Sequence, residues 1–203
     1  ITLATGQLIL LGEKKLTSYI PKDKLGILRV ALASILGIGL VWNGLMDTRK
    51  TVVASKNIYE QQIQTSKFLG KYYLREVIAV FDIGAVSFYS DARLIDIAGL
   101  ANNQIAALIS SGGFNSQSVK KILKTENTKI IIIPEVVKKR LNLDTLNWEY
   151  AGSWKIKKNV VCASDEIHFF GSNRTEASIL RKNLEEFFPR LPKDVVYTKN
   201  LPE

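Results

Sequence analysis

The sequence contains one cysteine and one histidine among its 203 residues. A single cysteine excludes a disulfide within the chain, and with one histidine beside it a zinc site of the usual kinds has too few ligands. Cys162 lies in the apolar run Val160 to Ala163, which predicts a small buried side chain. His168 lies in the alternating run Glu166 to Phe170, where we expect it on the polar face of a strand. We therefore expect no metal site.

Glycine-rich phosphate loops are missing as well. The segment Asp82-Ile83-Gly84-Ala85 lacks the GxGxxG spacing, and no GK[ST] motif occurs in the chain. We expect no cofactor for this reason. Internal repeats and low-complexity linkers are also missing, so residues 47–203 are expected to form one unit.

One long apolar run is present, from Leu25 to Leu45, with Arg29 as its single charge. Its 21 residues match the length of about 20 that a membrane-spanning helix needs. Arg29, Ser34 and Asn43 fall at different helical azimuths, which argues against an amphipathic surface helix, and Trp42 suits an interfacial position near one end. The alternative is a buried helix of a soluble core. We predict a membrane segment over residues 1–46, made of a truncated apolar stretch, a basic loop and this transmembrane helix.

Basic residues give an orientation for this span. Five lie before it or at its start (Lys14, Lys15, Lys22, Lys24 and Arg29), and three follow it (Arg49, Lys50 and Lys56). Basic loops prefer the cytoplasmic side, so residues 47–203 are expected on the extracytoplasmic side.

The net charge of +9 comes from 28 basic and 19 acidic residues, and further basic residues form clusters after the span. They form three trios, which are Lys120, Lys121 and Lys124, then Lys138, Lys139 and Arg140, then Lys155, Lys157 and Lys158. Such trios can bind phosphate, nucleic acid or anionic lipid, and they also suit solvated faces. Aromatic residues do not alternate with them as in RNA-binding modules, so we expect membrane lipids and no nucleic acid as partners.

The alternation of helical and strand patterns along residues 47–203 predicts an α/β domain with a mixed sheet. The expected strands are Val77 to Phe81, Val86 to Ser90, Leu94 to Ala98, Lys129 to Ile133, Trp148 to Ile156, Val160 to Ala163 and Glu166 to Phe170. The expected helices are Asn57 to Leu74, Asn102 to Ser110, Ser116 to Lys124, Pro134 to Arg140 and Asn173 to Phe188. On the first helix, Glu60 and Gln64 are expected to face away from the sheet.

Two carboxylates come directly after predicted strands or near their ends, Asp82 and Asp96. Loops at strand ends are where α/β proteins meet ligands, which makes both residues candidates for a site. Aspartate beside glycine is also an ordinary turn former, so a structural role stays open for each.

The same region resembles a known family. It contains Phe81-Asp82-Ile83-Gly84-Ala85, the aromatic pair Phe88-Tyr89 leading to Asp91, and then Ile95-Asp96-Ile97-Ala98-Gly99-Leu100. In this order and spacing, these motifs resemble the segment after the last membrane helix of polytopic glycosyltransferases of the GT-C type, similar to the protein mannosyltransferases and lipid-linked sugar transferases. The resemblance covers residues 57–106.

The resemblance implies an integral membrane glycosyltransferase that takes a sugar from a polyprenyl-phosphate donor in an inverting displacement. In such enzymes the catalytic base and donor contacts lie mainly on loops between earlier membrane helices, so this part is expected to be inactive alone and to help acceptor binding or stability. The acceptor is a glycan or a protein. Asp82 and Asp96 are expected to face the acceptor groove, with Tyr89 and Arg93 as sugar or phosphate contacts.

Two alternatives remain open from the residues. One is a non-catalytic module, tethered to the membrane, that binds a glycan or a partner protein. The other is a soluble nucleotide-binding protein, which requires Leu25 to Leu45 to be a core helix.

Overall fold

The computed structural model describes residues 24–141 and 148–199. The predicted apolar stretch Ile1 to Leu11 and the basic loop before Lys24 lie outside these ranges. The chain divides into two compact units, Ile1–Lys50 and Thr51–Glu203, and the second is called the α/β unit.

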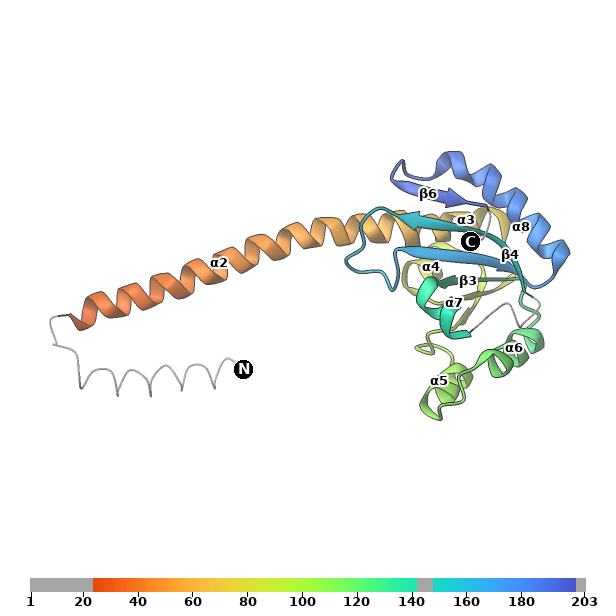
Figure 1. Ribbon diagram of the computed structural model, residues 1–203, viewed down its shortest axis with the longest axis horizontal. Coiled ribbons are helices and arrows are strands. Elements are labelled where there is room, and N and C mark those ends of the chain that lie inside the picture. The colour runs from red at the N-terminus through yellow and green to blue at the C-terminus, as the bar shows by residue number, and fades with distance from the viewer. Residues whose placement is uncertain (1–23, 142–147, 200–203) are drawn as a thin grey trace. The chain divides into compact units, whose positions relative to one another are not determined.

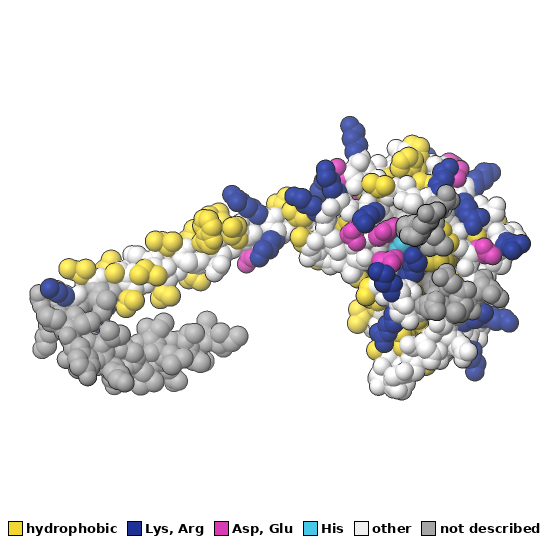
Figure 2. Space-filling view, in the orientation of Figure 1, with side chains coloured by type: hydrophobic (Ala, Val, Ile, Leu, Met, Phe, Trp, Pro, Cys, Tyr) yellow, Lys and Arg dark blue, Asp and Glu magenta, His cyan; other side chains and the backbone are white. Residues whose placement is uncertain are grey.

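Helix α2 spans Leu25–Ile58 and contains the predicted membrane span. Within the described residues it belongs to the one helical run that is long and apolar enough to cross a membrane. Its described side chains between Gly26 and Leu45 are all exposed, and Figure 2 shows hydrophobic side chains along this helix. The stretch is therefore not a core helix within the described chain, which is what the nucleotide-binding alternative required.

The helical run continues beyond the predicted end at Leu45. A π-helical turn, η1 (Tyr59–Ile63), follows α2 directly, and α3 (Gln64–Tyr72) follows η1. The predicted helix Asn57 to Leu74 is thus the continuation of the apolar helix, with a change of pitch in it. π-Helical turns inside α-helices are rare and are frequently found at functional sites.

The α/β unit contains a six-stranded mixed sheet with the strand order β2-β1-β3-β5-β4-β6. Figure 1 labels β3, β4 and β6 of this sheet. The strands are β1 (Val77–Val80), β2 (Arg93–Asp96), β3 (Ile130–Pro134), β4 (Glu149–Ile156), β5 (Glu166–Gly171) and β6 (Val195–Thr198). Strand β1 pairs in parallel with β2 and β3, whereas β3–β5, β5–β4 and β4–β6 are antiparallel pairs. The predicted mixed α/β sheet is confirmed.

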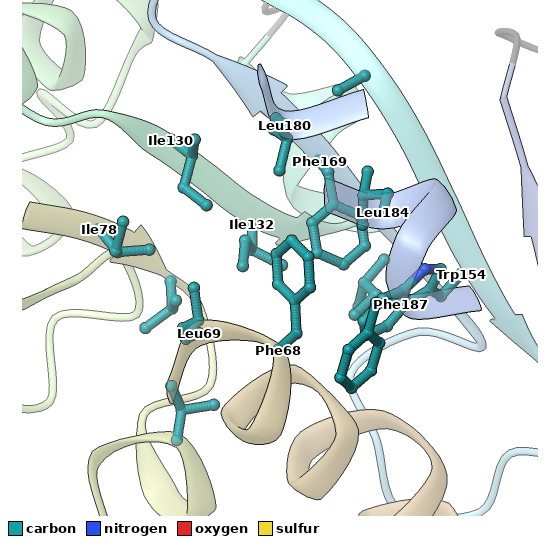
Figure 3. Close-up of a cluster of buried hydrophobic side chains, with 14 of the residues drawn as sticks. Phe68, Leu69, Ile78, Ile130, Ile132, Trp154, Phe169, Leu180, Leu184 and Phe187 are labelled. Atoms are coloured by element: carbon teal, nitrogen blue, oxygen red, sulfur yellow. The ribbon is translucent and has the colours of Figure 1, made fainter. Parts of the chain in front are cut away.

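One face of the sheet packs against α3 and α8 (Arg174–Phe187). Phe68 of α3 is 0% exposed, and its ring centroid lies 5.6 Å from those of Trp154 and Phe187 and 5.8 Å from that of Phe169. Figure 3 shows Phe68 among these aromatic rings, beside Ile132 and Leu184. Aromatic side chains bury large areas in such edge-to-face arrangements, so this cluster contributes strongly to stability.

The other face packs against α5 (Asn103–Ser110), α6 (Ser116–Thr125) and α7 (Glu135–Leu141) through a second cluster that includes Ile131 and Ile133. Isoleucines alternate between the two faces along β3, so this strand is buried on both sides, as its uninterrupted apolar run predicts. Asparagine side chains begin the helices as predicted: Asn102 accepts hydrogen bonds from two N–H groups of α5, and Asn173 accepts one from Glu176.

Two predicted strands are wrong. Residues Val86 to Tyr89 lie in a short helix, α4 (Gly84–Tyr89), in which only Val86 is buried, and Ser90 is its C-cap. Because β1 and β2 are parallel, the chain needs a crossover between them, and α4 forms it. Residues Val160 to Ala163 form a loop held by the side chain of Asn159, which accepts from the N–H groups of Val161 and Cys162.

Two further predictions can be compared with the structure, the burial of Cys162 and the number of strands at the end of the chain. The expected burial of Cys162 is confirmed, although it lies in that loop and not in a strand. Strand β6 was not predicted; it pairs only with β4, at the sheet edge, where a short segment needs no strong apolar pattern.

Candidate functional site

The helix before the sheet buries a polar face. Asn57, Glu60, Gln61, Gln62 and Gln64 are all buried, so the expectation that Glu60 and Gln64 face away was wrong. The surface opposite part of this face is the β4–β5 loop, whose backbone offers hydrogen-bonding groups instead of apolar side chains. Polar side chains on the helix can satisfy these backbone N–H and C=O groups, which apolar side chains would leave without partners.

Two side chains of this polar face bind that loop directly. Asn57 accepts a 2.9 Å hydrogen bond from the N–H of Val160 and donates to the carbonyl of Lys158. Gln61 donates to the carbonyl of Ser164 over 3.0 Å. These side-chain contacts fix the loop against the helix.

Asp82 lies where the π-helical turn meets the carboxyl end of β1. Gln62 of that turn donates a hydrogen bond to the Asp82 carboxylate, and the N–H of Gly84 donates another. From β1 the chain passes to β2 on one side and then returns to β3 on the other, so Asp82 marks the switch point of the parallel strands. Ligands of open α/β sheets bind at such points.

The cavity at this switch point is small. It has a volume of about 30 Å³, and its lining includes Gln61, Gln62, Thr65 and Asp82. This volume holds about two water molecules and not a sugar ring. In this arrangement Asp82 can bind water or a small polar group.

Burial dominates the electrostatics of Asp82. It raises the pKa of the Asp82 carboxyl, while the hydrogen bonds from Gly84 and Gln62 lower it and the charge of Asp96 adds a small upward contribution. Burial together with the nearby Asp82 charge raises the pKa of the Cys162 thiol to about 11. Cys162 is therefore a protonated, unreactive thiol at neutral pH.

Asp96 has a structural role in this geometry. The side chain is 3% exposed, and its two oxygens accept hydrogen bonds from the N–H of Ala98 at 2.8 Å and of Ala101 at 2.7 Å. Within the loop that it closes, Gly99 has a φ of +77°, and a Cβ there would lie 3.0 Å from the backbone N of Ala106. The motif Ile95 to Leu100 therefore encodes a tight loop between β2 and α5.

Tyr89 and Arg93 lie apart from the Asp82 cavity. Tyr89 is exposed at the end of α4, in an edge-to-face contact with Phe88. Arg93 is the first residue of β2 and forms a 2.6 Å ion pair with Glu126. In the β1–β2 register Arg93 is opposite Val77, at the amino end of the pair, whereas Asp82 follows the carboxyl end of β1. The four residues predicted to bind substrate thus do not form one site.

His168 is part of a buried polar pair that the sequence did not predict. It is 1% exposed, not on a solvated strand face as expected, and its Nε2 lies 2.5 Å from Oε2 of Glu135. In the sheet it stands opposite Ile133, which is followed by Pro134 and then Glu135. Glu135 comes two residues after Ile133, the strand partner of His168, and this spacing is the signal that could have indicated the pair.

Burial and neighbouring charges shift the pKa values of both members of this pair. Burial lowers the pKa of His168, and Lys138 lowers it further, although Glu135 raises it. Burial raises the pKa of Glu135, but His168 first, and then Lys138 and Lys139, outweigh this and lower the pKa. Ser153 is the other strand partner of His168, yet its hydroxyl donates to Glu166 over 2.6 Å. The arrangement is that of a structural pair, not of a serine nucleophile with its base.

Metal ligation has no support among the described residues, where no group of three or more histidine, cysteine, aspartate or glutamate side chains is placed to hold an ion.

Comparison with known proteins identifies the family of this chain. Neither a curated protein nor a solved structure matches the chain. A family model matches residues 56–175, which include the π-helical turn, the Asp82 cavity, the Asp96 loop and the first five strands of the sheet. Because this match covers more than half of the sequence, the chain belongs to the family described as a domain of unknown function, DUF8728.

Proposed function

We propose that this chain is the C-terminal part of an integral membrane glycosyltransferase that transfers a sugar from a polyprenyl-phosphate donor. Residues 25–45 cross the membrane in this proposal, and residues 47–203 lie on the extracytoplasmic side. The observation that carries it is the exposed apolar stretch of α2 directly before a domain with the DIGA and IDIAGL motifs. An apolar stretch of this length favours a lipid environment.

The α/β unit has a supporting role in this proposal. The Asp96 carboxylate is occupied by backbone N–H groups, and the cavity beside Asp82 admits only water-sized groups. Neither carboxylate has the open approach that a catalytic base needs. The unit therefore helps acceptor binding or stability, while the catalytic base and the donor contacts belong to other parts of the enzyme.

Truncation of the full-length enzyme tests this role. Removal of residues 47–203 should leave the donor bound but reduce sugar transfer to the glycan or protein acceptor strongly. An Asp82→Asn variant of the same enzyme should leave kcat unchanged, because the cavity beside Asp82 admits only water-sized groups and Asp82 is not the catalytic base in this proposal. Transfer that is unaffected by the truncation would refute the supporting role.

Topology is tested separately, with single cysteines in place of Lys121 and Lys139 in a Cys162→Ala background. Both are exposed on helices of the α/β unit. A membrane-impermeant thiol reagent should label both in intact cells, because residues 47–203 are extracytoplasmic in the proposal. Labelling only after the membrane is permeabilised would place the unit in the cytoplasm and contradict this orientation.

The alternative is a membrane-tethered, non-catalytic module that binds a glycan or a protein. It is favoured by the closed surroundings of the two predicted site carboxylates, since Asp96 accepts backbone N–H groups and the Asp82 cavity admits only water-sized groups. The full-length gene product distinguishes the two: a protein with many apolar spans favours the transferase, and a single span favours the module.

A further inference from the structure

A groove in the α/β unit lies between α3 and the end of α8, where the short helix η3 (Phe188–Arg190) follows. Its volume of about 370 Å³ is that of a small-molecule site, and it is lined by Tyr59, Gln64, Lys67, Lys71, Phe187 and Arg190. The rings of Phe68 and Phe187, with centroids 5.6 Å apart, hold the two helices together (Figure 3). We call this site the cationic groove, and it shares no lining residue with the Asp82 cavity.

Three polar side chains of α3 line the cationic groove, Gln64, Lys67 and Lys71. They are three and four residues apart, so the helical repeat places them in a row on one side of the helix. Gln64 is 2% exposed, whereas Lys67 is exposed and its Nζ lies 5.3 Å from the ring centroid of Tyr59 in a cation–π contact. The row therefore begins with a buried amide and continues with cations.

The amide of Gln64 has no hydrogen-bond partner within residues 24–141 and 148–199. The polar atoms that are both unpartnered and fully enclosed, such as Ser66 Oγ, do not include those of Gln64, so the amide keeps part of the small accessible surface of this residue. Because Gln64 is otherwise buried and lines the cationic groove, its amide faces the groove. A buried polar group without a partner is unfavourable, and a ligand in the groove can supply the missing hydrogen bond.

The lining of the cationic groove contains three basic side chains and no carboxylate. Glu186 does not line the groove, but it accepts a 2.6 Å hydrogen bond from Lys71 and compensates that charge. This hydrogen bond raises the pKa of Lys71, whereas the charge of Arg190 lowers it, so Arg190 lies within electrostatic reach of Lys71. Neither Lys67 nor Arg190 forms an ion pair with another residue that the structure describes. Two positive charges at the groove thus lack a counter-ion from the protein, which favours an anionic ligand.

We propose that the cationic groove binds a phosphate monoester. Such a group carries about 1.5 to 2 negative charges at neutral pH, which matches the two uncompensated cations, whereas a carboxylate would leave one of them unmatched. The guanidinium of Arg190 can bind two phosphate oxygens, while Lys67 and the amide N–H of Gln64 donate to the phosphate as well. The phosphate belongs either to a soluble ester or to a lipid headgroup. The proposal does not rest on the proposed function, because a binding module can contain the same groove.

Isothermal titration of the full chain in nonionic detergent micelles tests the proposal, with glycerol 3-phosphate, acetate and micelle-embedded phosphatidic acid as probes. Glycerol 3-phosphate should bind saturably, and acetate more weakly because it carries less charge. Saturable binding of phosphatidic acid alone would support the site and identify a lipid as the source of the phosphate. Equal binding of acetate and glycerol 3-phosphate would overturn the choice of a monoester, and no saturable binding of either phosphate probe would overturn the site.

A pair of lysine variants locates the site. Lys67→Gln removes one uncompensated charge and should weaken binding of the phosphate probe by about tenfold, as expected for one charge-assisted hydrogen bond. Lys182→Gln is the matched control: Lys182 is an exposed lysine of α8 that does not line the groove, so this variant should change nothing. Equal effects of the two variants would overturn the assignment of binding to the groove.

A third variant separates binding from folding. Gln64→Met removes the amide, keeps a long buried side chain and breaks no hydrogen bond within the described chain, so it should weaken binding by about tenfold without lowering Tm. Gln64→Glu places a carboxylate at the same point and should abolish binding by repulsion. A lower Tm of Gln64→Met with unchanged binding would show that the amide serves the packing of α3, and would overturn its place in the site.

Discussion

Replacement of Asp96 by asparagine distinguishes a structural aspartate from one that serves an acceptor. Each carboxylate oxygen accepts one backbone N–H, from Ala98 at 2.8 Å and from Ala101 at 2.7 Å. Asparagine keeps one acceptor oxygen and presents an NH₂ group to the other N–H, so one charge-assisted hydrogen bond is lost. A bond of this kind contributes about 1.5–3 kcal/mol to the free energy of unfolding.

This loss translates into a thermal shift. For a unit of this size, 1 kcal/mol changes Tm by about 2–4 °C, so Asp96→Asn should lower Tm by about 3–12 °C. Tryptophan fluorescence of the full chain in detergent micelles can follow the transition, because Trp154 is buried in the core. Asp91→Asn is the matched control: Asp91 is exposed and lies 3.8 Å from the exposed Arg75, so we expect no measurable change.

The contrary result is specific. If Asp96→Asn leaves Tm within a degree of the wild-type value and instead impairs acceptor use by the full-length enzyme, the two hydrogen bonds do not stabilise the loop. The motif Ile95 to Leu100 would then be a functional element, and its interpretation as a tight loop would be wrong.

Three further predictions concern the core and the buried titratable groups. Phe68→Ala should cost about 3–5 kcal/mol of unfolding free energy in the same fluorescence assay, whereas the 79% exposed Phe88→Ala should cost almost nothing, and equal losses would contradict the packing in Figure 3. Burial raises the pKa of Asp82 in the folded state, so this carboxyl contributes stability below its unfolded pKa that is lost as pH rises through the folded pKa. The Tm of Asp82→Asn minus the Tm of the wild type should therefore increase as pH rises from 3 to 7. Burial lowers the pKa of His168, so the unfolded chain takes up a proton that the folded chain does not, and stability should fall between pH 7 and 5. His168→Gln should remove most of this fall, and an unchanged pH dependence would show that His168 is not its source.

Much of the fold follows from local patterns in the chain. The uninterrupted isoleucines of β3 predict a strand buried on both faces, and Asn102, Asn115 and Asn173 mark the starts of three helices that the structure contains. These features depend on residues that are neighbours in the sequence, through periodicity and capping. Secondary structure of this kind needs no knowledge of what packs against it.

The errors concern segments whose structure is decided by distant neighbours. Val86 to Ser90 has the composition of a strand, yet the parallel pairing of β1 with β2 requires a crossover there, and the segment is helical. Gln64 and His168 are polar residues that the sequence pattern places on solvent-facing sides. Gln64 instead belongs to a buried polar helix face, and His168 contacts Glu135 at the end of the sheet.

The candidate sites show the same division between sequence and tertiary structure. The sequence by itself determined an apolar span, an α/β alternation and two aspartates near strand ends. Only the tertiary structure decided that Asp82 lines a cavity while Asp96 closes a loop, and that Lys67 and Arg190 share a groove. The physical reason is that hydrophobic periodicity is encoded within a few residues, whereas the environment of a polar side chain depends on groups brought to it by the packing of the whole sheet.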